Sequence, residues 1–220
     1  WCGRAARDDS LGAMVGRVRS AIDGRAQGGA QVMATWTEIT IGEMGIRRTA
    51  PVVRTEADDG GGFTLCGVPA GSPVIVRAWS GRDSTGFVEL DVPATGVLMR
   101  SLLLAPSGFA AADGAGGAGD TLVRATGGGV LRGVVRRPDG APLEGARTMV
   151  WGTGREATSG SDGAFAMAGL PVGTQTLEAR AIGYAPLRVA VDLAEGEGVT
   201  RELQLVRARA VLDTIKVRGE

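Results

Sequence analysis

Two residue types that carry much of enzyme chemistry are missing from this 220-residue sequence, which contains no histidine and no asparagine. Without histidine there is no Ser–His–Asp triad, no imidazole general base and no histidine-ligated metal. Without asparagine there is no N-glycosylation acceptor and no Cys–His–Asn site. The sequence therefore predicts a protein that is not an enzyme, with no catalytic residues, no metal ligands and no cofactor.

An excess of charge of either sign is also lacking, since 24 basic residues balance 24 acidic ones, and Lys216 is the only lysine. A balanced, interspersed charge argues against a nucleic-acid partner. The longest apolar cluster, Val97–Ala105, is interrupted by Arg100 and Ser101. It falls well short of the roughly 18 apolar residues of a membrane-spanning helix. We therefore expect neither nucleic-acid binding nor a membrane span.

Local features that resemble binding sites have simpler interpretations. The carboxylate pairs Asp8–Asp9 and Asp58–Asp59 lack the alternating oxygen ligands of a calcium loop. The run Gly60–Gly62 lacks the lysine and hydroxyl residue of a phosphate-binding loop. Trp36 and Trp151 hold matching positions in a sequence repeat described below, which favours a core or interface role over sugar stacking.

The sequence contains two cysteines, Cys2 and Cys66. An even pair in a chain without metal-site residues indicates one disulfide in an oxidising compartment. The alternative is two unpaired thiols, one buried and one near the terminus. A disulfide would tie the N-terminal segment to the strand expected around residues 63–67.

Internal repetition is the most informative feature of the sequence. One set of residues recurs at an offset of 102: Phe63, Gly67, Pro69 and Gly71 match Phe165, Gly169, Pro171 and Gly173. A second set recurs at an offset of 101: Val88, Leu90, Asp91, Arg100, Leu102 and Leu104 match Val189, Val191, Asp192, Arg201, Leu203 and Leu205. Because the order and spacing agree over nearly the whole of both halves, we infer a tandem duplication.

Within each copy, apolar and polar residues alternate with a period of two over short runs bounded by Asp-Gly and Pro-Gly steps. This pattern predicts an all-β fold of two antiparallel β-sandwiches of immunoglobulin-like or transthyretin-like type. Residues 107–129 contain eight glycines and six alanines, a composition typical of a flexible linker. The expected organisation is an N-terminal arm (1–10), two sandwich domains (11–106 and 130–207) joined by that linker (107–129), and a strand-like tail (208–220).

The first copy contains extra residues after its second expected strand that the second copy lacks. Trp36 lies 23 positions before Asp59, whereas Trp151 lies 11 positions before Asp162. The extra residues predict a long hairpin over residues 37–57, with alternating arms at Thr37–Ile41 and Ala50–Arg54. Such a hairpin is either a functional projection or a simple extension of the sheet.

The second copy contains Asp139-Gly140-Ala-Pro142-Leu143-Glu-Gly145, then Phe165, Gly169-Leu-Pro171, and Gly183-Tyr184-Ala-Pro186. These motifs closely resemble the carboxypeptidase regulatory-like domain, a transthyretin-like β-sandwich common in exported bacterial proteins. The resemblance covers about residues 130–206, and the first copy is a looser member that lacks the Gly-Tyr-x-Pro step. The resemblance implies a non-catalytic module for folding, recognition or assembly.

A separate strand-like segment follows the last repeat: Val211, Leu212, Asp213, Thr214, Ile215, Lys216 and Val217. It resembles the TonB box, the short Asp/Glu-Thr-apolar-x-Val stretch of TonB-dependent outer-membrane receptors, which works by adding a strand to a partner's sheet. The chain departs from the receptor pattern because it carries two modules and no plug or barrel sequence.

Two functions of different classes follow. The first is an exported structural subunit that self-associates head to tail by β-strand addition, the kind of contact that builds an extracellular filament, with residues 211–217 as the partner strand. The second is the periplasmic extension of a TonB-dependent receptor, in which an envelope protein pairs with the same strand. A ligand-binding cell-envelope module has less support. The location expected from the resemblance is the periplasm, cell surface or exterior of a Gram-negative-type bacterium.

Overall fold

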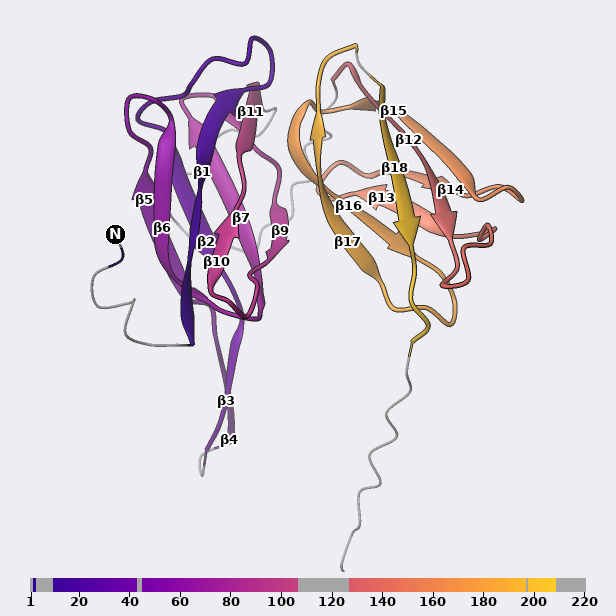
Figure 1. Ribbon diagram of the computed structural model, residues 1–220, viewed down its shortest axis with the longest axis horizontal. Helices are drawn as coiled ribbons and strands as arrows, with labels where there is room; N and C mark the ends of the chain where they lie inside the picture. Colours follow the sequence, from indigo (N-terminus) through magenta and orange to yellow (C-terminus); the bar gives the residue numbers. More distant parts are fainter. Residues whose placement is uncertain (1, 3–9, 43–44, 107–126, 197, 209–220) are drawn as a thin grey trace, which may run out of the picture.

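The computed structural model describes residues 2, 10–42, 45–106, 127–196 and 198–208, which form only strands, turns and loops. Figure 1 shows the strands gathered into two bodies that lie side by side. The strands of the first body are β1 (Leu11–Ser20), β2 (Gln31–Thr35), β3 (Glu38–Gly42), β4 (Gly45–Thr49), β5 (Val52–Glu56), β6 (Gly62–Pro69), β7 (Pro73–Ser80), β8 (Asp83–Ser84), β9 (Val88–Asp91), β10 (Val97–Met99) and β11 (Leu102–Pro106). Those of the second body are β12 (Gly129–Arg136), β13 (Arg147–Val150), β14 (Arg155–Thr158), β15 (Ala164–Leu170), β16 (Gly173–Arg180), β17 (Leu187–Leu193) and β18 (Gly198–Gln204). The predicted all-β fold is confirmed.

Both bodies are β-sandwiches whose main strands pair alike; β8, which pairs with β7 and β11 of the first body, has no counterpart among the described strands of the second. In the first, β1 pairs antiparallel with β6 and parallel with β10 and β11, while β2 lies between β5 and β7, and β9 pairs with β7. In the second, β12 pairs antiparallel with β15 and parallel with β18, while β13 lies between β14 and β16, and β17 pairs with β16. The two halves of the sequence therefore share one topology, as the repeat predicts.

Each sandwich closes on its own apolar core, formed by the inward-facing residues of its two layers. The first core includes Met14, Leu65, Val76, Leu102 and Leu104, and the second includes Leu131, Leu170, Leu177, Leu193 and Leu203. All ten side chains are fully buried. Since burial of apolar area is the main favourable term in folding, two separate cores make the sandwiches separate packing units.

The glycines Gly16 and Gly133 occupy equivalent positions on β1 and β12, where the parallel neighbour crosses closely. A Cβ atom at Gly16 would lie 1.8 Å from the carbonyl oxygen of Arg100. At Gly133 it would lie 2.2 Å from the carbonyl oxygen of Arg201 and 2.6 Å from the ring of Phe165. Only glycine fits this crossing, which explains why it recurs in both copies.

The substitution Gly133→Ala is expected to lower the free energy of unfolding by about 1–3 kcal/mol, the usual cost of overpacking a closed core. The added methyl group must displace backbone at Arg201 or the ring of Phe165. The control is Gly198→Ala, whose methyl group would meet only the mobile end of Arg132, at 3.3 Å. Urea titration of both variants checks the prediction, and an equal effect from the two would contradict it.

The extra residues of the first copy form a narrow ribbon, β3–β4, that projects beyond the end of its sandwich (Figure 1). The strands pair from Glu38 with Thr49 to Gly42 with Gly45. The predicted second arm, residues 50–54, is wrong: Val52–Glu56 pairs with β2 inside the main sheet instead. The arm that turns back on β3 is Gly45–Thr49, whose sequence Gly-Ile-Arg-Arg-Thr does not alternate, so periodicity did not identify it.

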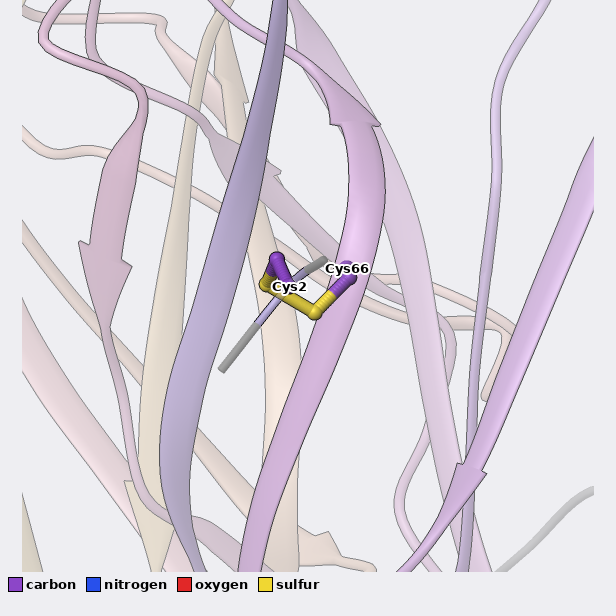
Figure 2. Close-up of a disulfide and its surroundings, with 2 residues drawn as sticks. All are labelled: Cys2 and Cys66. Atoms are coloured by element: carbon purple, nitrogen blue, oxygen red, sulfur yellow. A yellow bond between two sulfur atoms is a disulfide. The ribbon is translucent and has the colours of Figure 1, made fainter. Parts of the chain in front are cut away.

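The sulfur atoms of Cys2 and Cys66 are joined in a disulfide, with the two Cα atoms 5.5 Å apart (Figure 2). Cys66 lies on β6 opposite Ala13 of β1. The bond closes a sequence separation of 64 residues and fixes Cys2 against the first sandwich.

Candidate functional site

The residues predicted to contact a partner, Val211 to Val217, lie outside the described residues, as do Asp8–Asp9 and most of the predicted linker, whose last residue, Gly129, begins β12. Cys2 and Cys66 are the predicted site residues that the structure describes. Within the described ranges, no three potential ligands come together as a metal site. The described surfaces that remain are the contact between the two sandwiches, a hollow on the first sandwich, and the β3–β4 ribbon.

The contact between the sandwiches centres on β16, whose residues from Gly173 to Ala179 are all buried. One side of the strand, with Leu177 and Ala179, faces the second core. The other side carries Thr174, Thr176 and Glu178, and it faces β9 and β11 of the first sandwich (Figure 1). The apolar side of β16 is covered by the second core and the polar side is covered by the first sandwich. Burial of both sides indicates that the two sandwiches pack closely against each other.

Two threonine hydroxyls of the second sandwich form hydrogen bonds with backbone groups at the edge of the first sandwich. The Leu103 N–H donates to Oγ1 of Thr174 at 2.8 Å. The Glu89 N–H donates to Oγ1 of Thr176 at 2.9 Å, and this hydroxyl donates to the carbonyl oxygen of Phe87 at 2.9 Å. Since unpaired buried backbone groups are costly, these bonds hold the sandwiches in one register.

A buried carboxylate, Glu178, anchors one end of the contact and is only 1% exposed. Arg188 donates to its Oε2 from Nε at 2.6 Å, Trp151 donates from Nε1 at 3.1 Å, and Arg180 forms an ion pair with Oε1. Arg188 also reaches across to Glu89 of the first sandwich, at 3.0 and 3.2 Å from its two carboxylate oxygens. Its guanidinium stacks over the Trp151 ring, 4.8 Å from the centroid.

Two opposing effects act on the pKa of Glu178. Burial raises the pKa, while hydrogen bonds from Arg180, Arg188 and Trp151 lower it, and the net pKa lies below the ordinary value of 4.5. The carboxylate is therefore held ionised by its partners. The hydrogen bond that Arg188 forms with Glu178 raises the pKa of Arg188, burial lowers it and the hydrogen bond with Glu89 raises it, so the net pKa is raised.

A second ion pair, between Arg100 and Asp192, spans the contact with Nη2 and Oδ2 2.8 Å apart. Oδ1 of the same carboxylate accepts a hydrogen bond from the Thr174 hydroxyl at 2.7 Å. Sequence reasoning did not identify this contact, because outward-facing Thr and Glu on a strand are also typical of a solvent-exposed face. The contact fixes one sandwich relative to the other, which a flexible linker such as the one predicted over residues 107–129 does not do by itself.

A hollow of about 560 Å³ lies at the base of the ribbon, on the outer face of the first sandwich. Its apolar lining includes Trp36, Pro73 and Ile75, and its polar lining includes Glu38 and Glu89. Trp36 packs against the first core and donates from Nε1 to Glu38 at 2.8 Å. The hollow offers an apolar floor with carboxylates at its rim, which suits a contact with another polypeptide.

The ribbon carries exposed isoleucines on one face. Ile39, Ile41 and Ile46 are 65%, 79% and 75% exposed, and Ile41 pairs with Ile46 across the two strands. Arg48 stands opposite Ile39, so it shares this face. Exposed apolar clusters of this kind mark interaction surfaces.

The Asp58 carboxylate serves a turn. Its Oδ1 accepts hydrogen bonds from the Gly60 N–H at 2.9 Å and from the Gly62 N–H at 2.7 Å. An aspartate that binds backbone N–H groups two and four residues ahead is ordinary turn chemistry. This geometry agrees with the interpretation of Asp58–Asp59 as a hairpin turn.

Residues 130–206 match the family model of the carboxypeptidase regulatory-like domain. The resemblance inferred from sequence is thereby confirmed for the second sandwich. The matched region runs from the start of β12 to just past β18, so it covers the whole regulatory-like sandwich, including β16 and its contact residues. No curated protein matches the sequence.

Several solved structures are similar in general architecture. The minor pilin GBS52 of Streptococcus agalactiae is 12% identical, with a TM-score of 0.34 and coverage of 95% of this chain and 100% of that chain. The shaft pilin SpaA of Lactobacillus rhamnosus GG is 11% identical, with a TM-score of 0.30 and coverage of 91% and 99%. A type II cohesin–X-dockerin complex of Acetivibrio cellulolyticus is 16% identical, with a TM-score of 0.33; the match covers 36% of this chain and 58% of that chain. At these values they are no guide to the function of this chain.

Proposed function

We propose that the protein is a non-enzymatic, exported assembly subunit that self-associates head to tail by β-strand addition. The observation that carries the proposal is the strand-like sequence Val211–Val217, which follows a body whose sheets end in edge strands such as β5, β14 and β18. In strand addition, a segment of this kind pairs its backbone donors and acceptors with the edge of a neighbour's sheet.

Export is supported by the disulfide between Cys2 and Cys66, because such bonds persist in oxidising compartments. The cell surface, exterior or periplasm of a Gram-negative-type bacterium is the proposed location. Among the described residues, no helix has the length and apolarity needed to cross a bilayer. The partners are other copies of the chain, with an envelope protein as the alternative partner for residues 211–217.

The position of the buried polar side chains supports a non-catalytic role. Thr174, Thr176 and Glu178 are buried at a contact between two bodies and are all engaged in hydrogen bonds there. These hydrogen bonds hold two domains together. The charges of Glu178 and Glu89 are balanced by those of Arg180 and Arg188.

The test compares the full chain with a chain that ends at Ala208. Sedimentation velocity over a wide concentration range, with negative-stain imaging, is expected to show oligomers of the full chain and only monomers of the shortened one. The variant Ile215→Pro is expected to fail as well, because proline lacks the N–H that strand pairing uses. Ile215→Val is the matched control and is expected to assemble. A full chain that stays monomeric at every concentration contradicts the proposal and favours the receptor-extension function.

A further inference from the structure

The internal contact joins two different surfaces of one repeated module. The first sandwich contributes an edge, formed by β9 and β11, and the second contributes a face, formed by β16 and β17. Because both sandwiches share one topology, each has both surfaces. Glu89 of β9 and Asp192 of β17 already serve the internal contact. Among the described residues, Pro73, Ile75 and Asp91 on the β7–β9 face of the first sandwich and Arg201 on the β18 edge of the second form none of the hydrogen bonds or ion pairs given above between the sandwiches.

The unused face corresponds residue by residue to the used one. Cross-strand pairs on the two faces match at an offset of 101: Thr174–Asp192 matches Pro73–Asp91, and Thr176–Ala190 matches Ile75–Glu89. In the second sandwich these positions are covered by the first sandwich. In the first sandwich Pro73, Ile75 and Glu89 line the hollow of about 560 Å³. The hollow therefore lies where the repeat relationship places the edge of another module.

One polar feature of the internal contact is retained in the unused surfaces. Arg100 and Asp192 form one of the two ion pairs described above that span the sandwiches. Their repeat equivalents are Arg201 and Asp91, since 201 − 100 and 192 − 91 both equal 101. Asp91 is exposed and Arg201 is half-buried, and the Arg201 guanidinium donates a hydrogen bond to the carbonyl oxygen of the neighbouring Thr200. An acid on the free face and a base on the free edge are complementary.

We propose that the β17–β18 edge of one copy docks on the β7–β9 face of the next copy, with Arg201 of the first paired to Asp91 of the second. The inference rests on the proposed function in so far as both require self-association. The contact is heterologous, so each copy keeps one free face and one free edge, and addition continues without closing. Repeating the internal contact between copies therefore produces a linear assembly of evenly spaced sandwiches.

The contact between copies is weaker than the internal one. Pro73 and Ile75 stand where Thr174 and Thr176 bond the backbone edge, so the hydroxyl bonds are replaced by apolar contact. The internal contact also benefits from being within one chain, which raises the effective concentration of its partner. Association between copies is therefore reversible and depends on protein concentration.

The test uses two single charge reversals, Asp91→Arg and Arg201→Asp, made in the full chain. Each variant alone places like charges at the contact, and its dissociation constant for self-association is expected to rise about tenfold or more. An equimolar mixture of the two variants restores opposite charges at every contact, so it is expected to assemble with an affinity within about threefold of the natural chain. Sedimentation velocity measures all four samples, and circular dichroism verifies that each variant is folded.

The control is Arg132→Asp, an exposed reversal on the outer face of β12, which is expected to leave assembly unchanged. Single reversals that assemble like the natural chain overturn the inference. So does a mixture that assembles no better than either variant alone. If those results occur while the chain ending at Ala208 is monomeric, the proposed function stands and this docking surface falls. If the shortened chain assembles and the mixture shows rescue, docking stands and strand addition falls.

Discussion

Replacement of Glu178 by glutamine is expected to lower the free energy of unfolding by about 3 kcal/mol. Breaking a buried charge pair costs about 3–5 kcal/mol when the remaining charge stays buried. We expect the lower end of this range because the side chains of Arg180 and Arg188 are 58% and 33% exposed, so water partly hydrates their charges once the carboxylate is lost. Urea titration of the full chain measures the loss.

The matched control for this substitution is Glu156→Gln. Glu156 forms an ion pair with Arg147, but the two side chains are 50% and 61% exposed, and such surface pairs contribute about 0–1 kcal/mol. A loss at Glu178 no larger than that at Glu156 would show that the carboxylate does not hold the two sandwiches together.

The pKa of Glu178 gives this contribution a pH dependence. Because the pKa is lowered on folding from its ordinary value of 4.5, the contribution is fully present above that value. It is lost as the pH falls through the lower pKa of the folded state, where the unfolded chain binds the proton first. Thermal midpoints of the natural chain and Glu178→Gln are therefore expected to differ most near neutral pH and to converge in acid. A constant difference down to about pH 3 would contradict this account.

Loss of the Cys2–Cys66 disulfide is expected to destabilise the protein by up to about 4 kcal/mol, the chain-entropy value for a loop of this length. The bond spans 64 residues of sequence, so its removal frees much of the first sandwich in the unfolded state. Cys66 is half-buried on the outer side of β6, so its replacement by serine leaves the core intact.

The measurement compares thermal midpoints of the oxidised chain, the reduced chain and the double variant Cys2→Ser with Cys66→Ser. The last two are expected to melt together, well below the oxidised chain. Gly133→Ala under oxidising conditions serves as the comparison, because it acts in the other sandwich. No change on reduction would indicate that the tether does not constrain the unfolded chain.

The fold was largely predictable, since strand alternation and Asp-Gly turns depend on local sequence. The repeat further predicted that both halves pair their strands alike, and the equivalent crossings at Gly16 and Gly133 agree. The internal contact was not predictable, because Thr174, Thr176 and Glu178 have the outward polarity of a solvent-exposed strand. Their burial depends on how two complete bodies dock, which alternation along one strand does not encode.

The ribbon shows the same limit at a smaller scale. Residues 45–49, Gly-Ile-Arg-Arg-Thr, do not alternate, so alternation did not predict their pairing with β3. The register of Val52–Glu56 with β2 places that run in the main sheet. Repeat equivalence was the more useful guide to function. It relates Arg201 and Asp91 to an ion pair that the structure describes, Arg100 with Asp192.

Hydrogen exchange at residues 211–217 tests the central claim, self-association by strand addition, most directly. The full chain is measured at a low concentration, where it is monomeric, and at a high concentration, where it is assembled. The account predicts rapid exchange in the monomer and strong protection of alternate backbone amides in the assembly, because an added edge strand directs every second N–H to the neighbouring sheet. Exchange that stays as fast in the assembled protein as in the monomer would contradict it.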